Sequence, residues 1–247
     1  MLPLAVEIWS DIACPWCYIG KRRFETALRN TPNIGPVSVT WRAFELDPSA
    51  PKSYPEHPRH NERLARKYGM SVAEANQMVL RVVGLGKPEG IDFDFDAIRG
   101  GNTFDAHRLL AFAKAHAAPG APTQDALKER LMRAYFSEGA ALGDPSVLAG
   151  LAHAVGLDAD GVAQVLATDQ HAADVRHDEA TAAQLGVRGV PFFKIGRYGV
   201  SGAQPAELLG QVLSKARADS FDSDAVDARG DASAGASDEV CDTEHPC

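Results

Sequence analysis

Apolar and polar positions along the chain predict strands near both ends and helices between them. Residues 4–9 are mostly apolar and rich in β-branched and aromatic side chains, which predicts a strand. Residues 18–28 carry apolar side chains at helical spacing, and apolar positions alternate over residues 37–44 as in a second strand. A strand, a helix and a strand within this length favour a right-handed parallel βαβ unit.

The middle of the chain, from residue 59 to residue 185, is helical in pattern and shows no internal repeat. We expect about six helices in this block. Strand signals return at residues 192–195 and 198–201 and predict an antiparallel hairpin, and residues 205–218 predict a last helix. Without the helical block the order is β-α-β followed by β-β-α, which is the order of the thioredoxin fold.

The sequence therefore predicts an α/β protein, a thioredoxin fold split by a large all-helical insertion domain and followed by an acidic tail. We expect the N-terminal part of the thioredoxin fold in residues 1–56 and its C-terminal part in residues 187–218. The helical insertion takes residues 57–186. The tail, rich in Asp, Ser, Ala and Gly, takes residues 219–247 and is expected to be flexible.

The composition is that of an ordinary globular chain of 247 residues, 45% of them hydrophobic, with a net charge of −8. Nine acidic residues and one arginine fall between Ala218 and Cys247, so the tail holds the surplus of negative charge. A body without a basic patch does not favour nucleic acid as a partner. No apolar run approaches membrane-spanning length and no secretory signal precedes the first strand, so we expect a cytoplasmic protein without a membrane partner.

The segment Cys14-Pro15-Trp16-Cys17 lies where the first predicted strand turns into the first helix. Proline suits the first helical turn, where a backbone N–H has no helical partner. Because residues three apart share a helix face, the two cysteines can close a small disulfide. The partial positive charge of the helix N-terminus favours the thiolate of Cys14, which predicts Cys14 as the nucleophile and Cys17 as the half-buried resolving thiol.

Two other uses of a C-x-x-C pair stay open. Half of a zinc site would need a second pair of ligands, and no such pair follows at zinc-finger spacing. An inert structural disulfide fits poorly with a chain that shows no secretory signal. The pattern therefore favours a redox-active dithiol.

Further segments together resemble a known family. They are W-S-D-I-A-C-P-W-C-Y-I-G-K (9–21), F-E-L-D-P (44–48), N-T-F-D-A-H-R-L (102–109) and G-V-P-F-F (189–193). In combination they look like the DsbA-like branch of the thioredoxin superfamily, most closely its FrnE-like subgroup. The resemblance implies a thiol–disulfide oxidoreductase or disulfide isomerase, with chaperone-like holding of unfolded chains. Its implied partners are disulfide-containing or unfolded proteins and a cellular thiol reductant. No cofactor is required, and glutathione is open as a redox partner.

The resemblance also assigns roles around the dithiol. Pro191 corresponds to a cis-proline that faces the dithiol, with Val190 before it, and the backbone there can pair with an extended substrate. The alternative is an ordinary trans proline at the start of a strand. Trp16 and Asp11 flank the cysteines and are expected to contact substrate, Trp16 as an exposed side chain.

Glu7 lies in the first predicted strand, where proteins of this family often hold a buried acid. A buried carboxyl has a raised pKa, and Glu7 is therefore a candidate proton relay to Cys17. A register that differs by one residue would instead leave Glu7 exposed.

The same body resembles hydroxychromene-carboxylate isomerases and kappa-class glutathione transferases, in which a serine replaces the first cysteine. In those proteins the stretch that corresponds to Asn102 and Asp105 lies near bound glutathione. A glutathione-dependent isomerase or transferase is therefore the first alternative function, although both cysteines are present here. His107 in the same stretch is expected to be structural.

A second cysteine pair, Cys241 and Cys247, ends the chain. This pair can close a disulfide and exchange it with the first pair as a redox relay. Cys241, His245 and Cys247 are also suitable ligands for Zn²⁺ or a softer ion, and a third option is two exposed thiols without a role. A metal-binding or redox-sensing protein that uses this pair is the second alternative function.

Overall fold

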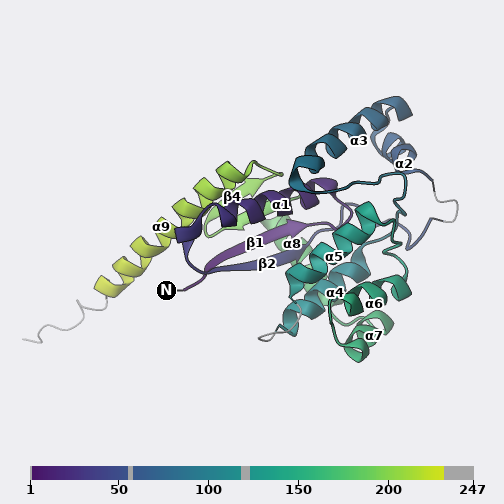
Figure 1. Ribbon diagram of the computed structural model, residues 1–247. Helices are drawn as coiled ribbons and strands as arrows, with labels where there is room; N and C mark the ends of the chain where they lie inside the picture. The colour runs from purple at the N-terminus through teal and green to yellow at the C-terminus, as the bar shows by residue number, and fades with distance from the viewer. Residues whose placement is uncertain (1, 55–57, 118–122, 231–247) are drawn as a thin grey trace, which may run out of the picture.

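The computed structural model describes residues 2–54, 58–117 and 123–230 (Figure 1). The strands in these ranges are β1 Leu4–Ser10, β2 Val37–Ala43, β3 Phe192–Ile195 and β4 Tyr198–Ser201. The α-helices are α1 Pro15–Arg29, α2 His60–Tyr68, α3 Val72–Gly86, α4 Phe104–Ala115, α5 Gln124–Ser137, α6 Pro145–Ala154, α7 Ala159–Ala167, α8 Ala172–Gln184 and α9 Ala206–Gly230. Short 3-10 helices are η1 Pro32–Ile34 and η2 Lys87–Glu89.

The strands form one mixed sheet in the order β2-β1-β3-β4. β1 and β2 are parallel, with Leu4 opposite Val37 and Ser10 opposite Ala43, and α1 connects them as the predicted βαβ unit. β3 is antiparallel to both β1 and β4, which confirms the predicted hairpin. Helices α2 to α8 lie between β2 and β3 in the chain, which confirms a thioredoxin fold split by a helical insertion.

The two faces of the sheet pack against different helices. Val6 and Ile8 of β1 form one hydrophobic core with Phe24 of α1 and with α9. Trp9 points to the other face, where it packs against Ala182 of α8. The alternation along β1 therefore decides whether a side chain faces α1 or α8.

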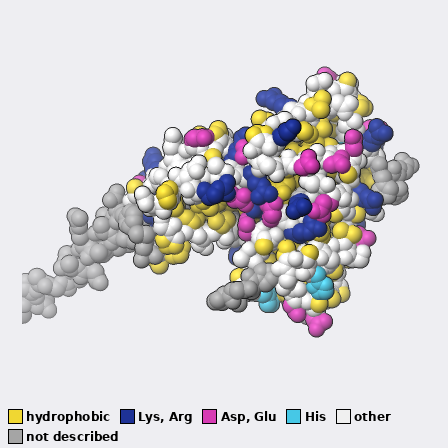
Figure 2. Space-filling view, in the orientation of Figure 1, with side chains coloured by type: hydrophobic (Ala, Val, Ile, Leu, Met, Phe, Trp, Pro, Cys, Tyr) yellow, Lys and Arg dark blue, Asp and Glu magenta, His cyan; other side chains and the backbone are white. Residues whose placement is uncertain are grey.

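The inserted helices form a second hydrophobic core that continues into the start of α1. Its buried side chains come mainly from α4 to α7, for example Leu109, Leu131 and Leu148, and they join Ile12 and Tyr18 beside the cysteines. Acidic and basic side chains gather where α1 and α5 meet (Figure 2). Helix α1 thus belongs to both cores.

The side chain of Gln124 connects the insertion to the edge of the sheet. Gln124 is the first residue of α5, and its Oε1 accepts the N–H of Trp41 in β2 at 2.9 Å while its Nε2 donates to the Trp41 carbonyl at 2.8 Å. A side-chain amide thus satisfies both backbone groups of one residue on an edge strand.

Helix α9 is held to the N-terminal part of the chain by a buried arginine. Arg217 Nε donates to the Ile34 carbonyl at 2.6 Å, and Nη1 donates to the Leu2 carbonyl at 3.0 Å. The helix then continues to Gly230, so the prediction of a tail from residue 219 is wrong for 219–230, because extending an existing helix needs no new nucleus. No helix in the described ranges is long and apolar enough to cross a membrane.

We predict that Gly20→Ala destabilises the protein. A Cβ built at Gly20 would lie 2.8 Å from Cγ of Pro191, so α1 and the segment before β3 would have to separate. We expect a loss of about 1–3 kcal/mol in the free energy of unfolding, measured by urea denaturation.

Gly150→Ala is the matched control, because Gly150 lies in helix α6 with open space around its Cα. Relief of glycine's backbone entropy should stabilise this variant by about 0.5–1 kcal/mol. Equal effects at the two positions would contradict the close approach at Pro191.

Candidate active site

The two cysteines lie at the start of α1. Cys14 is the N-cap and Pro15 the first helical residue, and the N–H of Cys14 donates to the Asp11 carbonyl at 3.3 Å. Proline at this position needs no N–H partner and pre-sets the helical φ. Both cysteines are free thiols; Cys14 is 3% exposed, and Cys17 is completely buried rather than half-buried. Cys14 is thus the sulfur closer to solvent.

The Val190–Pro191 peptide bond is cis, as predicted, and lies beside the dithiol. The Cys14 thiol donates to the Val190 carbonyl oxygen, with 3.6 Å between sulfur and oxygen. These two groups are 176 residues apart in the chain, and the fold brings them together across the helical insertion. The site therefore combines thiols from the first half of the thioredoxin fold with a backbone carbonyl from the second.

Opposing electrostatic effects act on the Cys17 thiol. Burial raises the pKa of Cys17 well above its ordinary value, and the hydrogen bond and charge of Cys14 raise it further. The charge of Lys128 and the backbone N–H of Asp11 act in the opposite direction. Lys128 extends from α5, is completely buried, and its Nζ donates to the Ser10 carbonyl at 3.3 Å.

Asp11 is buried and binds groups of the protein itself, and it also lines the cleft at Cys14, so its contact with substrate stays a prediction. Its carboxylate accepts the N–H groups of Leu46 at 2.8 Å and Ala13 at 3.3 Å, and Nε2 of His107 lies 3.4 Å away. Burial alone would raise the pKa of Asp11, but His107 and the Leu46 N–H lower it below its ordinary value. Asp11 therefore ties the loop before α1 to the segment after β2.

The proton-relay role expected for Glu7 is also wrong, because Glu7 lies on the other face of the sheet from α1. Its place in the β1 alternation is on the side of Trp9 and α8, and its carboxylate pairs with Arg42 of β2 and Lys194 of β3. Burial would raise the pKa of Glu7, but these two cations lower it below its ordinary value. An ionised Glu7 thus joins three neighbouring strands.

A cleft of about 900 Å³ opens at Cys14, between the start of α1 and the helices α2 and α3. Trp16 lines this cleft and is 38% exposed, as predicted for its side chain, and its contact with substrate stays a prediction. Leu46, Tyr68 and Met78 are exposed as well and line the same cleft. Figure 2 shows hydrophobic side chains over α3 with Lys and Arg side chains near them.

The two residues expected near glutathione in the first alternative are engaged within the protein. Nδ2 of Asn102 donates to Oε1 of Glu45 at 3.1 Å, and Oδ1 of Asp105 pairs with Nη1 of Arg108 at 2.8 Å. Neither Asn102 nor Asp105 lines the cleft at the dithiol.

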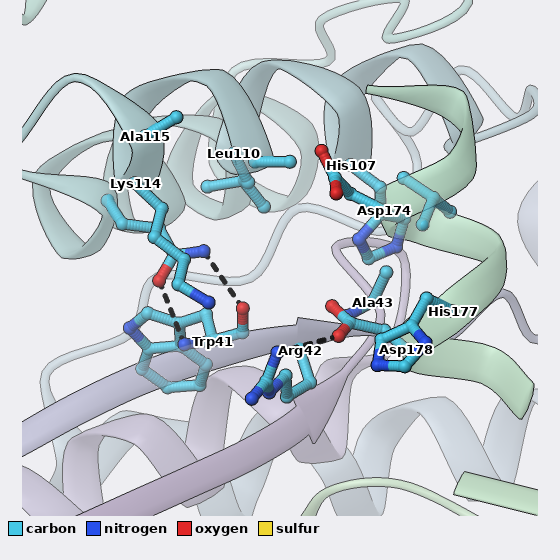
Figure 3. A pocket seen from close by; sticks show the side chains of 13 residues that line it. Trp41, Arg42, Ala43, His107, Leu110, Lys114, Ala115, Asp174, His177 and Asp178 are labelled. Atoms are coloured by element: carbon cyan, nitrogen blue, oxygen red, sulfur yellow. Dashed lines mark hydrogen bonds and ion pairs between the residues drawn. The ribbon is translucent and has the colours of Figure 1, made fainter. Parts of the chain in front are cut away.

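A second, smaller cavity of about 220 Å³ lies between β2 and the helices α4 and α8 (Figure 3). Its polar groups bind one another: Asp178 of α8 accepts from Nη1 of Arg42 at 2.9 Å and from the N–H of Ala43 at 3.0 Å. His107 lines this cavity with its Nε2 toward Asp11. These bonds attach α8 to the edge strand, and neither Cys14 nor Cys17 lines this cavity.

Cys241, His245 and Cys247 lie outside the described residues, and their redox and metal roles stay predictions. Within the described ranges, no group of three or more His, Cys, Asp or Glu side chains could hold a metal ion.

Lys128 is the polar residue of the site that the sequence analysis misses. It carries no motif, but Gln124, Lys128 and Met132 follow one another at four-residue spacing, and all three are buried. These three residues lie next to the apolar stripe that contains Leu127 and Leu131. Two adjacent stripes at helical spacing are the signal in the sequence that this helix is buried on more than one side.

We predict that the two thiols differ strongly in alkylation of the reduced protein. At pH 8 iodoacetamide should modify Cys14 first and leave Cys17 largely unmodified, because burial keeps Cys17 protonated and away from the reagent. Peptide mass spectrometry over time measures both rates, and comparable rates would contradict this site geometry. Cys17→Ser should retain the fast modification, and Cys14→Ser should lose it.

Comparisons with known proteins show what this chain is similar to. A probable DsbA oxidoreductase from Streptomyces coelicolor has a similar structure, with 44% sequence identity and a TM-score of 0.79 over 86% of this chain and 89% of that one. The uncharacterized protein YwbO of Bacillus subtilis is 26% identical over 212 residues, which are 85% of this chain and 95% of that protein. The cytosolic disulfide reductase DsbM from Pseudomonas aeruginosa with glutathione shares the fold, with 18% identity and a TM-score of 0.56 over 87% of this chain and 96% of that one. The model of the DSBA-like thioredoxin domain matches residues 5–214, and the chain therefore belongs to this family of thiol–disulfide oxidoreductases.

Proposed function

We propose that this protein exchanges disulfides with protein substrates in the cytoplasm, as a reductase or isomerase, through Cys14 and Cys17. The observation that carries the proposal is the cleft at the dithiol, where the Cys14 thiol lies 3.6 Å from the Val190 carbonyl oxygen. A nucleophilic sulfur is thereby placed beside backbone that can pair with an extended chain.

The reaction runs in two thiol–disulfide exchanges. The Cys14 thiolate attacks one sulfur of the substrate disulfide, a mixed disulfide forms, and the other substrate sulfur leaves as a thiolate that takes a proton from water. Cys17 then loses its proton and attacks the Cys14 sulfur. The Cys14–Cys17 disulfide forms, the second substrate thiol is released, and two electrons have passed from the enzyme to the substrate. Isomerisation results when a different thiol of the substrate attacks the substrate sulfur of the mixed disulfide: a new substrate disulfide forms and Cys14 leaves as a thiolate.

The lining of the cleft supports an extended protein segment as the substrate. Trp16, Tyr68 and Met78 expose apolar surface beside Cys14, which suits the apolar side chains of an unfolded protein. The same surface supports chaperone-like holding of unfolded chains as an accompanying activity.

Glutathione is the thiol reductant that we propose for the oxidised enzyme. The similar fold of the disulfide reductase DsbM, whose structure contains glutathione, supports this choice. Basic side chains also outnumber acidic ones along the cleft and are suited to its carboxylates; they are Arg63, Arg66, Lys67 and Arg188. Because Asn102 and Asp105 are engaged elsewhere, we assign glutathione the role of a redox partner and not that of a cofactor for isomerisation of small molecules.

We predict that Cys17→Ser accumulates mixed disulfides between Cys14 and substrate. Without the resolving thiol the first exchange still occurs and the second does not, so a reduced substrate should not be released. Incubation with a disulfide-containing peptide, followed by non-reducing electrophoresis and mass spectrometry, measures the adduct.

Cys14→Ser is the control, and it should form no adduct and show no exchange. A Cys17→Ser variant with full turnover would contradict the dithiol mechanism and favour a glutathione-dependent reaction at Cys14.

A further inference from the structure

The protein contains two buried lysines near the dithiol, and their surroundings differ. Lys21 of α1 forms ion pairs with three carboxylates, those of Glu25, Asp125 and Glu129. Lys128 of α5 is equally buried, yet it forms no ion pair with a carboxylate among the residues that the structure describes. A buried ammonium without such a partner costs stability, so its retention calls for another explanation.

The position of Lys128 connects it to Cys17 through one peptide group. Its Nζ donates to the carbonyl of Ser10 at 3.3 Å. The N–H of the same peptide group, which belongs to Asp11, lowers the pKa of Cys17. Trp41 covers the ammonium from β2, with 5.5 Å between Nζ and the ring centroid. A cation on the carbonyl end of a peptide group polarises it and makes its N–H a stronger donor to a thiolate.

We propose that Lys128 is the positioning residue that stabilises Cys17 as a thiolate, both by its charge and through the Ser10–Asp11 peptide group, and so allows Cys17 to resolve the mixed disulfide. This inference rests on the proposed function. The charged and titratable groups that face Lys128 are Cys14, Cys17 and Asp11 next to it, Lys21 from α1 and His107 from α4.

The state of Cys14 decides when this effect matters. In the reduced protein the charge and hydrogen bond of Cys14 raise the pKa of Cys17, against the lowering effect of Lys128. In the mixed disulfide Cys14 has no ionisable thiol and no longer raises the pKa of Cys17, whereas the charge of Lys128 still lowers it. The Cys17 proton then leaves to water, the thiolate attacks the Cys14 sulfur, and the electron pair of the broken bond leaves with the substrate sulfur, which takes up a proton. Cys17 is thereby held protonated before a substrate has bound and is activated afterwards.

Resolution of a defined mixed disulfide tests this role. A cysteine peptide coupled to Cys14 of the full-length protein is released when Cys17 attacks, and stopped-flow detection of the released thiol gives the rate between pH 5 and pH 10. In Lys128→Gln the amide can still donate to the Ser10 carbonyl, but the charge is absent; Lys128→Met removes both. We expect both variants to form the mixed disulfide at the wild-type rate.

The resolution rate should fall about tenfold or more at pH 7 in both variants, and its midpoint should move upward by at least about one pH unit. Lys21→Met, which removes the other buried lysine, should lower the melting temperature and leave the midpoint of the resolution rate unchanged.

If the resolution rate of Lys128→Gln or Lys128→Met has the same pH midpoint as that of the wild-type protein, the proposed role of Lys128 is wrong, whatever the stability of the variant. If Lys128→Met is too unstable to measure, Lys128→Gln decides alone, because it keeps the hydrogen-bond donor. If the wild-type protein forms no mixed disulfide with the peptide, the proposed function is contradicted instead. That outcome is distinct from a wild-type pH midpoint in the Lys128 variants.

Discussion

Helix α1 is buried along two faces, and the rest of the structure depends on this constraint. One face packs on the sheet through Phe24 and Ala27, and the other continues into the core of the insertion through Tyr18 and Ile19. A helix shared by two cores cannot tilt or slide without disturbing both, because protein interiors are close-packed. The two cysteines at its start are therefore fixed relative to the sheet and to the inserted helices at once.

The same constraint explains why the insertion contributes to the chemistry. An ordinary βαβ unit leaves the outer face of its helix to solvent, whereas here α5 lies against that face. Charged side chains that would be solvated in a smaller protein are consequently buried or paired. Lys21 forms ion pairs with three carboxylates, and the charge of Lys128 lowers the pKa of Cys17. The inserted helices thus contribute to the electrostatics of a site whose backbone belongs to the thioredoxin part of the fold.

Local pattern was sufficient to predict the strands, the split thioredoxin fold and the position of the dithiol, because each depends on neighbours in sequence. The cis-proline at Pro191 was predicted by the resemblance of its motif to the family. The interpretation of Glu7 as a proton relay failed for a different reason. A shift of one residue in the expected register of β1 moves a side chain to the other face of the sheet. The burial of Asp11 depends on partners from distant loops, which its neighbours in sequence do not reveal. Lys128 was missed because a buried lysine on an amphipathic helix looks like an exposed one until the packing partner of the helix is known. Residues 219–230 continue a helix although their composition suggests a tail.

The order of the chain has a consequence for how the protein is made. About 150 residues separate β2 from β3, so the sheet is completed by contacts of high sequence separation, which form slowly. During synthesis the insertion leaves the ribosome before the carbonyl of Val190 and before Arg217, which ties α9 to the N-terminal segment. A nascent chain therefore carries Cys14 and Cys17 well before it carries the strand that completes their site. Until the segment with Val190 has been synthesised, Cys14 and Cys17 are themselves cysteines of an incomplete protein. They are then open to oxidation and to incorrect disulfide pairing, like the cysteines of any other folding chain.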